Sequence, residues 1–366
     1  MKKNSSIYVA GHTGLVGSAI IRKLKAESFS NLITCGHAEL DLTRQADVEA
    51  FFQEQKPEYV FLAAAKVGGI LANDTFPADF IYSNIVIQTN IIHAAWRTGV
   101  KRLLFLGSSC IYPGECPQPM KEEYLLTGPL EPTNEPYAVA KIAGIKMCQS
   151  YNRQYGTNFI SVMPTNLYGP NDNFNLETSH VLPAMIRKSH LAKLAAKGDW
   201  DGIIKDGQKF GAIPEDIMAN LAAIAQYYGR LIPDSFKSFT SASDLSPGIT
   251  MWGTGAPCRE FLHVDDLADA CVFIINLNEK VYRSLLAMDI PALINIGSGR
   301  EISINELSLV IKNIVGFDGE IIFDDTRPDG MLKKLLDVSK ITGLGWEPKI
   351  SLKEGISSTY DSFKKI

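Results

Sequence analysis

The sequence predicts an α/β fold in which a doubly wound parallel sheet is followed by a smaller, mixed α/β C-terminal domain. Two observations support this prediction. Short β-branched and aromatic runs alternate with helical apolar patterns through the first half of the chain, and a glycine-rich turn joins the first run to the first helix. The 366 residues are enough for one large or two modest domains.

The first predicted strand, 7–10, runs directly into the turn GHTGLVG, residues 11–17, and the apolar spacing of 18–24 predicts a helix after it. This order suits a dinucleotide pyrophosphate, because glycines let the backbone approach and a helix N-terminus supplies N–H donors. The later elements complete a Rossmann-type order. They are strands over 32–35, 59–65, 103–106 and 159–163, and a long helix over 78–96.

The end of the second strand bears on which nicotinamide cofactor binds. An NAD site ordinarily has an Asp or Glu there, against the ribose hydroxyls. Residues 34–38 read TCGHA and contain no acid, which favours NADP. His37, helped by His12 or Thr13, is the expected contact of the 2′-phosphate.

A tyrosine and a lysine stand one helical turn apart in EPTNEPYAVAKIAGIKMC, residues 131–148. Pro136 opens the helix, which places Tyr137 and Lys141 on one face. A phenol ordinarily has a pKa of about 10, and a neighbouring ammonium should lower it enough for acid/base work. Ser108, at the end of the fourth strand, could bond the substrate oxygen. Tyr-x-x-x-Lys alone is usually an ordinary helix face, but here it follows the glycine turn and a Ser-Ser strand end, in short-chain reductase order.

Longer motifs make the resemblance specific, and they cover nearly the whole chain apart from one inserted segment. They read LAAAKVGGI, NIIHAA, LFLGSSCIYP, EPTNEPYAVAKIAGIKMC, SYNRQYG, VMPTNLYGPNDNF, SHVLPA, MWGTGAPCREFLHVDD and RPDGMLKKLLDVS. The chain resembles the GDP-L-fucose synthase family, of the extended short-chain dehydrogenase/reductase superfamily. The resemblance implies NADPH-dependent conversion of GDP-4-keto-6-deoxy-D-mannose to GDP-L-fucose, by 3,5-epimerisation and then 4-keto reduction.

The resemblance also assigns site residues. Cys110 and His180 would be the acid/base pair of epimerisation, while Tyr137, Lys141 and Ser108 would serve the reduction. A lone cysteine is more often a packing residue, but the presence of His180 favours catalysis. The residues implied to hold NADP are Gly11, His12, Thr13, Gly14, Leu15, Val16, Gly17, His37, Asp41, Leu42, Ala64, Leu106, Gly107, Ser108, Ser109, Lys141, Pro164, Thr165, Asn166, Leu167 and His180. Those implied to bind the GDP-sugar are Lys188, Trp252, Arg259, Asp329 and Lys334.

Some positions depart from the family pattern and leave alternatives open. Thr13 and His37 stand where some relatives have arginine, and Lys188 keeps a charge but not the bidentate fork of arginine. The alternative is a C4 reductase, with or without epimerisation, of a related GDP-4-keto sugar such as a 6-deoxy-heptose or dideoxy sugar. A redox-sensing binding protein would be expected to lose Tyr137 or Lys141.

The predicted domains are 1–170, with return segments near 258–300 that include a strand at 293–297, and 171–366. The second contains an insertion of about 193–248, too long for a bare loop. Within it a helix should start at Pro214 and end at Gly229, with an apolar stripe. The stripe consists of Ile217, Met218, Leu221, Ile224, Ala225 and Tyr228. It could pack on its own domain, cover the sugar-nucleotide pocket or touch a partner subunit.

Composition limits the partners. The net charge of −4 argues against nucleic acid or an anionic membrane surface, and no apolar run is long enough to span a bilayer. The six cysteines lack metal-type spacing and indicate reduced thiols, so we expect a cytoplasmic protein with no metal site. The resemblance implies a homodimer formed by the helices near 78 and 137.

Overall fold

The computed structural model describes residues 1–240, 248–286, 292–327 and 329–365, which form two compact units. The first unit consists of Met1–Asn171, Glu260–Arg300 and Lys334–Leu352, and the second of Asp172–Arg259, Glu301–Lys333 and Lys353–Ile366. The chain therefore returns to the first unit twice. Sequence analysis expected only the return near 258–300, so the segment from Lys334, which it assigned to the substrate domain, lies in the first unit instead.

The first unit contains a six-stranded sheet in the order β2-β1-β3-β4-β5-β9, in which every neighbouring pair is parallel. The strands are β1 Ile7–Ala10, β2 Leu32–Ile33, β3 Tyr59–Leu62, β4 Arg102–Leu106, β5 Phe159–Pro164 and β9 Leu293–Ile296. β1 pairs with β2 on one side and with β3 on the other, so the order reverses there. A reversal of this kind places a ligand crevice at the carboxyl end of the strand.

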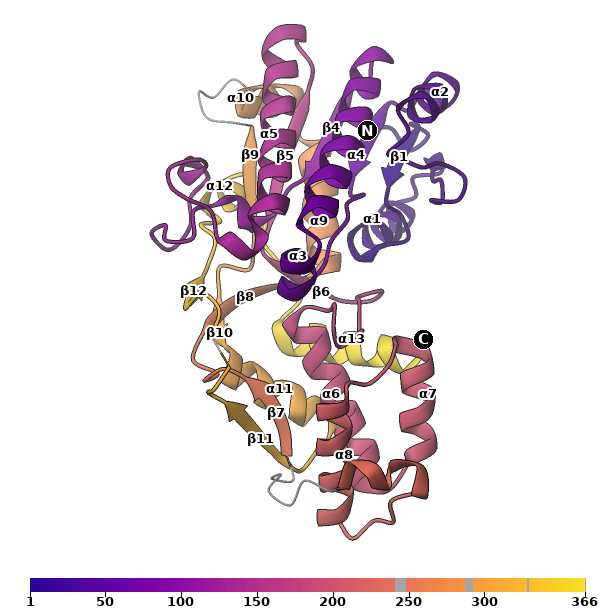
Figure 1. Ribbon diagram of the computed structural model, residues 1–366. Helices are drawn as coiled ribbons and strands as arrows, with labels where there is room; N and C mark the ends of the chain where they lie inside the picture. Colours follow the sequence, from indigo (N-terminus) through magenta and orange to yellow (C-terminus); the bar gives the residue numbers. More distant parts are fainter. Residues whose placement is uncertain (241–247, 287–291, 328, 366) are drawn as a thin grey trace. The chain divides into compact units, whose positions relative to one another are not determined.

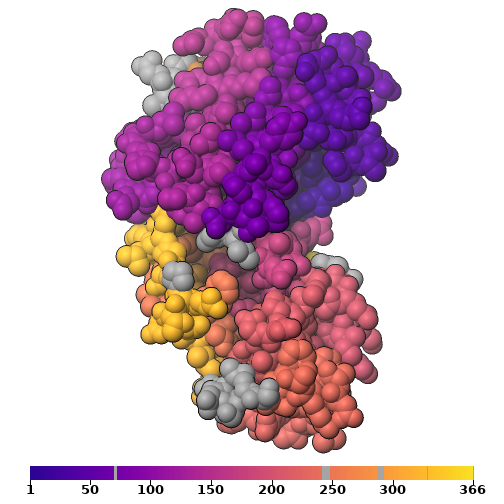
Figure 2. Space-filling view, viewed as in Figure 1, coloured from indigo at the N-terminus to yellow at the C-terminus, as the bar shows by residue number. Residues whose placement is uncertain are grey.

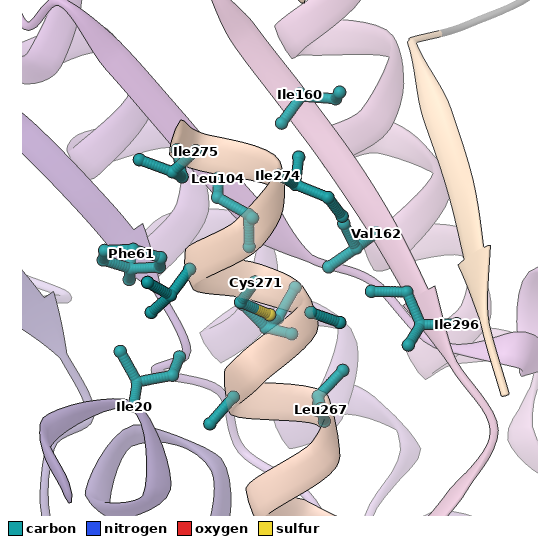
Figure 3. Packing of buried hydrophobic residues seen from close by; sticks show 14 of the residues in the cluster. Ile20, Phe61, Leu104, Ile160, Val162, Leu267, Cys271, Ile274, Ile275 and Ile296 are labelled. Atoms are coloured by element: carbon teal, nitrogen blue, oxygen red, sulfur yellow. The ribbon is translucent and has the colours of Figure 1, made fainter. Parts of the chain in front are cut away.

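Helices cover both faces of this sheet, as Figure 1 shows. Helices α1 and α9 pack on one face, and α2, α4 and α5 on the other. Figure 3 shows Leu267, Cys271 and Ile274 of α9 against side chains of the sheet such as Leu104 and Val162. These helices are α1 Leu15–Ala26, α2 Gln45–Gln55, α4 Pro77–Arg97, α5 Glu135–Tyr155 and α9 Val264–Asn276. The predicted doubly wound fold is confirmed.

Shorter elements complete the first unit. They are α3 Ile70–Thr75, three 3-10 turns (η1 Ser109–Ile111, η2 Glu122–Tyr124 and η3 Pro132–Asn134), β6 Asn166–Tyr168, α10 Glu279–Leu286 and α12 Ser339–Gly343. β6 pairs in parallel with β8, Cys258–His263, a strand that begins in the second unit and ends in the first. The predicted strand over 59–65 ends at Leu62 because the next residues leave the sheet to lie against Gly11. The predicted strand over 32–35 likewise ends early, at Ile33.

The second unit combines helices with a two-stranded parallel sheet, in which β7 pairs with β11. Its helices are α6 Val181–Lys197, α7 Trp200–Phe210, α8 Glu215–Tyr227, the 3-10 helix η4 Asp234–Thr240, α11 Ile304–Val315 and α13 Leu352–Lys365. Its strands are β7 Gly248–Trp252, β10 Glu301–Ser303 and β11 Glu320–Asp324, and β12, Lys333–Lys334, carries the chain back to the first unit. Among the described residues, no helix has both the length and the apolar character needed to cross a bilayer.

The inserted segment is helical, as predicted, and α8 matches the helix expected between Pro214 and Gly229. Met218, Leu221, Ile224 and Ala225 of the predicted stripe are buried, whereas Ile217 and Tyr228 are half-buried. α8 packs on α6 and β7 within the second unit. Of the three roles left open for the stripe, the structure therefore shows packing on its own domain.

A buried ion pair joins two helices of the second unit, α6 and α7. The Arg187 guanidinium donates to Asp206 Oδ1 at 2.7 Å and to the carbonyl oxygens of Phe174, Phe210 and Gly211. The side chain of Arg187 is 0% exposed and that of Asp206 is 4% exposed. Arg187 thus connects α6 to α7 and to the loops at 174 and 211.

Candidate active site

The glycine turn after β1 forms a tight backbone cradle. Gly11 has φ of +80°, and an added Cβ there would lie 2.8 Å from the Cα of Ala64. A Cβ on Gly17 would lie 2.1 Å from the carbonyl oxygen of Gly11. Helix α1 begins after Gly14, and no side chain of the described residues caps it. Its first amides can therefore bind an anion, and the cradle fits a dinucleotide pyrophosphate.

The turn after β2 contains an acid, Glu39, one residue beyond the segment 34–38 that sequence analysis considered. The carboxylate of Glu39 accepts a hydrogen bond from the Gly36 amide at 2.9 Å and one from Cys35 Sγ at 3.6 Å. The Gly36 amide holds the pKa of Glu39 below its ordinary value, with smaller contributions from Cys35 and from the charge of His12. Residues 34–38 contain no acid, but the next residue, Glu39, folds back onto Gly36, and the preference for NADP over NAD stays a prediction.

His37, Asp41 and Leu42, which were also predicted to contact NADP, follow β2 in the same segment of the chain. His37 is exposed, and Asp41 accepts bonds from the backbone amide and hydroxyl of Thr43 at 2.9 and 2.7 Å. These bonds lower the pKa of Asp41, and His37 and Arg44 add to the effect. Leu42 packs against the core, and its carbonyl oxygen accepts from Asn90 at 2.9 Å.

The serine and cysteine that follow β4 lie in the short turn η1. The Ser108 hydroxyl accepts a hydrogen bond from the Cys110 amide at 3.4 Å, which caps this turn. A Cβ on Gly107, just before this turn, would lie 2.0 Å from Met163 Cε, so the Met163 side chain would have to move. Ser109 and Cys110 are buried and Ser108 is half-buried. The structure therefore holds the Cys110 thiol at the carboxyl edge of the sheet.

Burial controls the protonation of Cys110. It raises the pKa of the thiol, and the charge of Lys334, the Ser108 hydroxyl and the charge of Lys141 oppose that rise. Lys334, predicted as a substrate contact of the other domain, therefore lies in the first unit within electrostatic range of Cys110. Cys110 holds its proton at neutral pH.

Lys141 connects α5 to the end of β4. Its ammonium is almost wholly buried and donates to the carbonyl oxygen of Leu106 at 2.8 Å. It lies 5.7 Å from the centroid of the Tyr137 ring. Burial lowers the pKa of Lys141 to about 8, partly opposed by Cys110.

Tyr137 differs from the sequence prediction in one respect. Sequence analysis expected Lys141 to lower the pKa of the phenol, but burial raises that pKa above its ordinary value, and Cys110 adds to the rise. The reason is that withdrawing the phenolate from water costs more than the neighbouring ammonium returns. The phenol therefore keeps its proton, which is the form that can donate to a carbonyl oxygen.

The predicted cofactor residues from Pro164 to Leu167 lie at the carboxyl end of β5 and just after it. Pro164 ends β5, and the Thr165 amide donates to the carbonyl oxygen of Ile296 at 3.0 Å. The side chains of Thr165 and Asn166 both donate to the carbonyl oxygen of Glu260, at 3.2 and 2.8 Å. Leu167, in β6, packs against the core. These contacts position the backbone that follows β5.

Sequence analysis did not predict a role for Glu260, whose backbone carbonyl accepts the bonds from Thr165 and Asn166. Its buried carboxylate accepts from the amides of Gly299 and Leu336, at 2.7 and 2.9 Å, and so joins the two returning segments. Burial raises its pKa. It stands in the motif CREFLHVDD, but its role depends on two distant amides that no local pattern indicates.

His180 and Lys188 belong to the second unit, on one helix. His180 is the N-cap residue of α6, and Lys188 lies two turns along it. Lys188 Nζ donates to the carbonyl oxygen of Thr250 at 3.2 Å. Burial lowers the pKa of Lys188, which Asp216 partly opposes. That His180 faces Cys110 stays a prediction.

Trp252, Arg259 and Asp329, the other predicted substrate residues, lie around the carboxyl ends of β7 and β11. The Trp252 indole is 58% exposed, and the Arg327 guanidinium stands 5.0 Å over its ring. Asp329 accepts from the amide and the hydroxyl of Thr254, at 2.9 and 2.7 Å, which lower its pKa. Arg259 donates to the carbonyl oxygens of Cys258 and Met331.

Thr254 bonds Asp329 and Arg327 lies over Trp252, so both belong to the group of residues around the carboxyl ends of β7 and β11. Sequence analysis did not name either of them. Both stand in the quoted motifs, MWGTG and RPDG, so their sequence signal was available. The bonds from Thr254 to Asp329 and the parallel pairing of β7 with β11 bring the two motifs together, which the sequence alone does not indicate. The result is an exposed aromatic face next to a guanidinium.

Comparison with known proteins agrees with this geometry. The family described as the NAD dependent epimerase/dehydratase family matches residues 7–207 and 217–297. The chain is 51% identical to GDP-L-fucose synthase 1 of Arabidopsis thaliana over 99% of its own length and 94% of that protein. It is 45% identical to the GDP-L-fucose synthase of Escherichia coli (strain K12), over 98% of its own length and 96% of that protein.

A solved structure is also similar along the whole chain. It is a GDP-mannoheptose C4 reductase from Campylobacter jejuni with NADP bound, with 40% identity and a TM-score of 0.80. The match covers 100% of this chain and 99% of that one. The glycine cradle, the Tyr137–Lys141 pair and these matches agree, and the chain belongs to the NAD dependent epimerase/dehydratase family, among the GDP-L-fucose synthases and their relatives.

Proposed function

We propose that this protein converts GDP-4-keto-6-deoxy-D-mannose to GDP-L-fucose, by epimerisation at C3 and C5 followed by reduction of the C4 ketone. The observation that supports this most strongly is the group at the carboxyl end of β4. There a buried thiol, a serine hydroxyl and a buried ammonium lie together, with a protonated phenol on the adjacent turn of α5. The relatives named GDP-L-fucose synthase support the choice of substrate.

The proposed cofactor is NADPH. The glycine cradle of Gly11 and Gly17 would hold its pyrophosphate on the first amides of α1, and Lys141 would bond the nicotinamide ribose. The bound cofactor would supply the hydride for C4. His12 and His37 are the proposed contacts of the 2′-phosphate, and the bound NADP of the related C4 reductase supports the choice over NAD.

The residues of the chain would carry the proton transfers. The ketone at C4 acidifies the hydrogens on C3 and C5, so a base on one face can remove a proton and leave an enolate. His180 is the proposed base, and Cys110, which holds its proton at neutral pH, would return one to the opposite face. For the reduction, Tyr137 would donate its proton to the C4 oxygen, which Ser108 bonds.

Hydrogen exchange tests the two steps separately. The protein is incubated with GDP-4-keto-6-deoxymannose and NADPH in D₂O, and the product is identified by NMR. We expect GDP-L-fucose with deuterium at C3 and C5. Cys110→Ser should stop inversion at C3 and C5, because deuterium that His180 returns to the same face leaves the configuration unchanged. Cys116→Ser, six residues away in a half-buried position, should still give GDP-L-fucose. Formation of the inverted product at an unchanged rate in the Cys110 variant would contradict the role given to this thiol.

A C4 reductase of a GDP-4-keto-heptose is the second candidate, because a GDP-mannoheptose C4 reductase matches the whole chain at 40% identity. The two candidates differ in the sugar and in the need for a second acid/base group. Turnover of the heptose substrate without turnover of the 6-deoxymannose one would favour this reading. The presence of both Cys110 and His180 favours an enzyme that still epimerises.

Contacts to the GDP part would come from the second unit. The exposed indole of Trp252 offers a stacking face, and Lys188 and Arg259 carry the positive charge that a diphosphate needs. Asp329, also of the second unit, and Lys334, of the first unit, are the other proposed contacts of the GDP-sugar. Because Lys334 lies within electrostatic range of Cys110, it would act near the reacting sugar rather than near the guanine.

We also propose a cytoplasmic homodimer. All six cysteines are free thiols, which fits a reducing compartment. Helices α4 and α5 lie on the viewed face of the first unit in Figure 2, and they expose Tyr82, Val139 and Tyr155. Apolar side chains of this kind suit a contact between copies. Light scattering at micromolar concentration should give about twice the mass of the 40.2 kDa chain.

A further inference from the structure

The loop of residues 172–179 leads into His180, the N-cap residue of α6, and its own hydrogen bonds make it compact. The side-chain oxygen of Asn175 accepts from the Glu177 amide at 3.0 Å. The backbone carbonyl oxygen of Asn175 accepts from the Ser179 amide at 2.9 Å, one residue before His180. The backbone position of His180 therefore depends on the position of Asn175.

The end of the inserted helix α7 lies directly against this loop. Helix α7 packs on α6, as Figure 1 shows. Gly211, which follows α7, has φ of +96°, and an added Cβ there would lie 2.4 Å from Asn175 Nδ2. A side chain at this position would therefore displace the amide group of Asn175 that shapes the loop.

One buried guanidinium bonds the loop and the end of α7 together. Arg187, on α6, donates to the carbonyl oxygen of Phe174 in the loop at 3.1 Å, and to those of Phe210 and Gly211 at 3.0 and 2.7 Å. Its Nε donates to Asp206 Oδ1 of α7, and Asp206 Oδ2 has no hydrogen-bond partner among the described residues. Because the guanidinium is planar, the bond to Asp206 also fixes the direction of its other N–H groups.

Aromatic packing attaches the loop to the same place by a second route. The ring of Phe174 lies 5.7 Å from that of Phe210 and 4.7 Å from that of Phe363 in α13. The rings of Phe210 and Phe363 are stacked at 4.6 Å. These contacts keep the loop attached when the polar bonds change, whereas the guanidinium determines how its backbone is oriented.

We propose that Arg187 and Asp206 are positioning residues for the epimerisation, and that through them the inserted helix α7 holds the 172–179 loop so that His180 can remove protons from C3 and C5. The inference rests on the proposed function, in which His180 is the base. Proton transfer needs the base within hydrogen-bond reach of the proton, so a small displacement lowers the rate in a protein that is still folded. The reduction uses Tyr137 of the first unit and should not depend on α7.

The two steps are measured separately on the full-length protein. Epimerisation is followed as deuterium uptake at C3 and C5 of GDP-4-keto-6-deoxymannose in D₂O without NADPH, at saturating substrate. Reduction is followed as single-turnover NADPH oxidation, with 4-keto sugar that the wild type has already epimerised without NADPH and from which it has been removed. Calorimetry with GDP measures nucleotide binding, and circular dichroism at the assay temperature shows that each variant is folded.

Two variants reach the loop by different routes. Arg187→Lys keeps the charge beside Asp206 but loses the fork that bonds the three carbonyl oxygens, so deuterium uptake should fall by about 10- to 100-fold. The rate of reduction and the affinity for GDP should stay unchanged. Gly211→Ala leaves the ion pair intact and displaces Asn175, and it should show the same selective loss.

Gly229→Ala is the matched control for the second variant. Gly229 follows α8 of the same insertion and also has a positive φ, of +64°, but no heavy atom of the described residues lies within 4 Å of its added Cβ. The substitution introduces a comparable backbone strain without touching the loop. It should therefore change neither deuterium uptake nor reduction.

The outcomes separate this inference from the proposed function. Unchanged deuterium uptake in folded Arg187→Lys and Gly211→Ala would overturn the inference and leave the proposed reaction in place. Equal losses of uptake, reduction and GDP affinity would also overturn it, because α7 would then support the second unit as a whole. Unchanged uptake in His180→Gln would show that the base is another residue, which overturns both the inference and the role proposed for His180.

Discussion

Lys141 donates a hydrogen bond from its buried ammonium to the carbonyl oxygen of Leu106, with the two atoms 2.8 Å apart. This bond fixes α5 against the end of β4, and so it fixes the turn of α5 that carries Tyr137 relative to the strand that leads into Ser108 and Cys110. The groups of the proposed reaction in the first unit are therefore positioned by one buried cation.

Replacing Lys141 should stabilise the protein while removing its activity. Burial lowers the Lys141 pKa to about 8 from an ordinary 10.5, which corresponds to an unfavourable contribution of about 3 kcal/mol at pH 7. Lys141→Met also loses the bond to Leu106, worth about 1 kcal/mol, so we expect a net gain in unfolding free energy of about 2 kcal/mol. Urea unfolding of both proteins at pH 7 measures it.

The pH dependence of that gain has a defined sign. The pKa of Lys141 is lower in the folded state, so between pH 8 and 10.5 the unfolded chain binds more protons. The stability of the wild type relative to the variant should therefore rise with pH over this range. An advantage of Lys141→Met that is the same at pH 7 and pH 10 would show that burial of the charge is not its cause.

Tyr137→Phe should stop the reduction and spare the epimerisation. The phenol keeps its proton because burial raises its pKa, and phenylalanine has no proton to donate. Loss of a general acid ordinarily costs about 10²- to 10⁴-fold in rate. Single-turnover NADPH oxidation measures the loss, and deuterium uptake at C3 and C5 in the same sample should continue. Loss of both steps together would mean that Tyr137 shapes the site as a whole.

Gly17→Ala should weaken the cofactor site. The new Cβ would lie 2.1 Å from the carbonyl oxygen of Gly11, so the backbone cradle must open. We expect a loss of about 1–3 kcal/mol of stability and at least about tenfold weaker dinucleotide binding. Gly343→Ala, in α12, is the control, since no heavy atom of the described residues lies within 4 Å of its added Cβ. It should stay within about 0.5 kcal/mol of the wild type.

Arg187→Met should destabilise the second unit. The substitution leaves the Asp206 carboxylate buried without its partner and three carbonyl oxygens without their donor, at a cost of about 3–5 kcal/mol. In the double variant Arg187→Met, Asp206→Asn the buried charge is also gone, so it should recover part of that loss. Urea unfolding of the three proteins decides this, and equal losses in the single and double variants would contradict it.

The sequence by itself determined the order of the elements and the chemistry of their ends. The glycine turn, the strand leading into Ser108 and Cys110, and the spacing of Tyr137 and Lys141 are local patterns, because the backbone needs of a turn and the period of a helix act over a few residues. The alternation of strands and helices predicted the doubly wound sheet, and an apolar stripe predicted the helix at 215–227. The roles given to the site residues of the first unit stay predictions. The strand ends were less accurate, since contacts from other loops decide where a strand leaves the sheet.

The tertiary structure decided what depends on burial and on distant segments meeting. It folded Glu39 back on Gly36, brought Lys334 near Cys110, and raised the pKa of Tyr137 where the sequence predicted a fall. Whether a charged group is paired or deprived of water depends on side chains far away in the chain, and no local pattern records them.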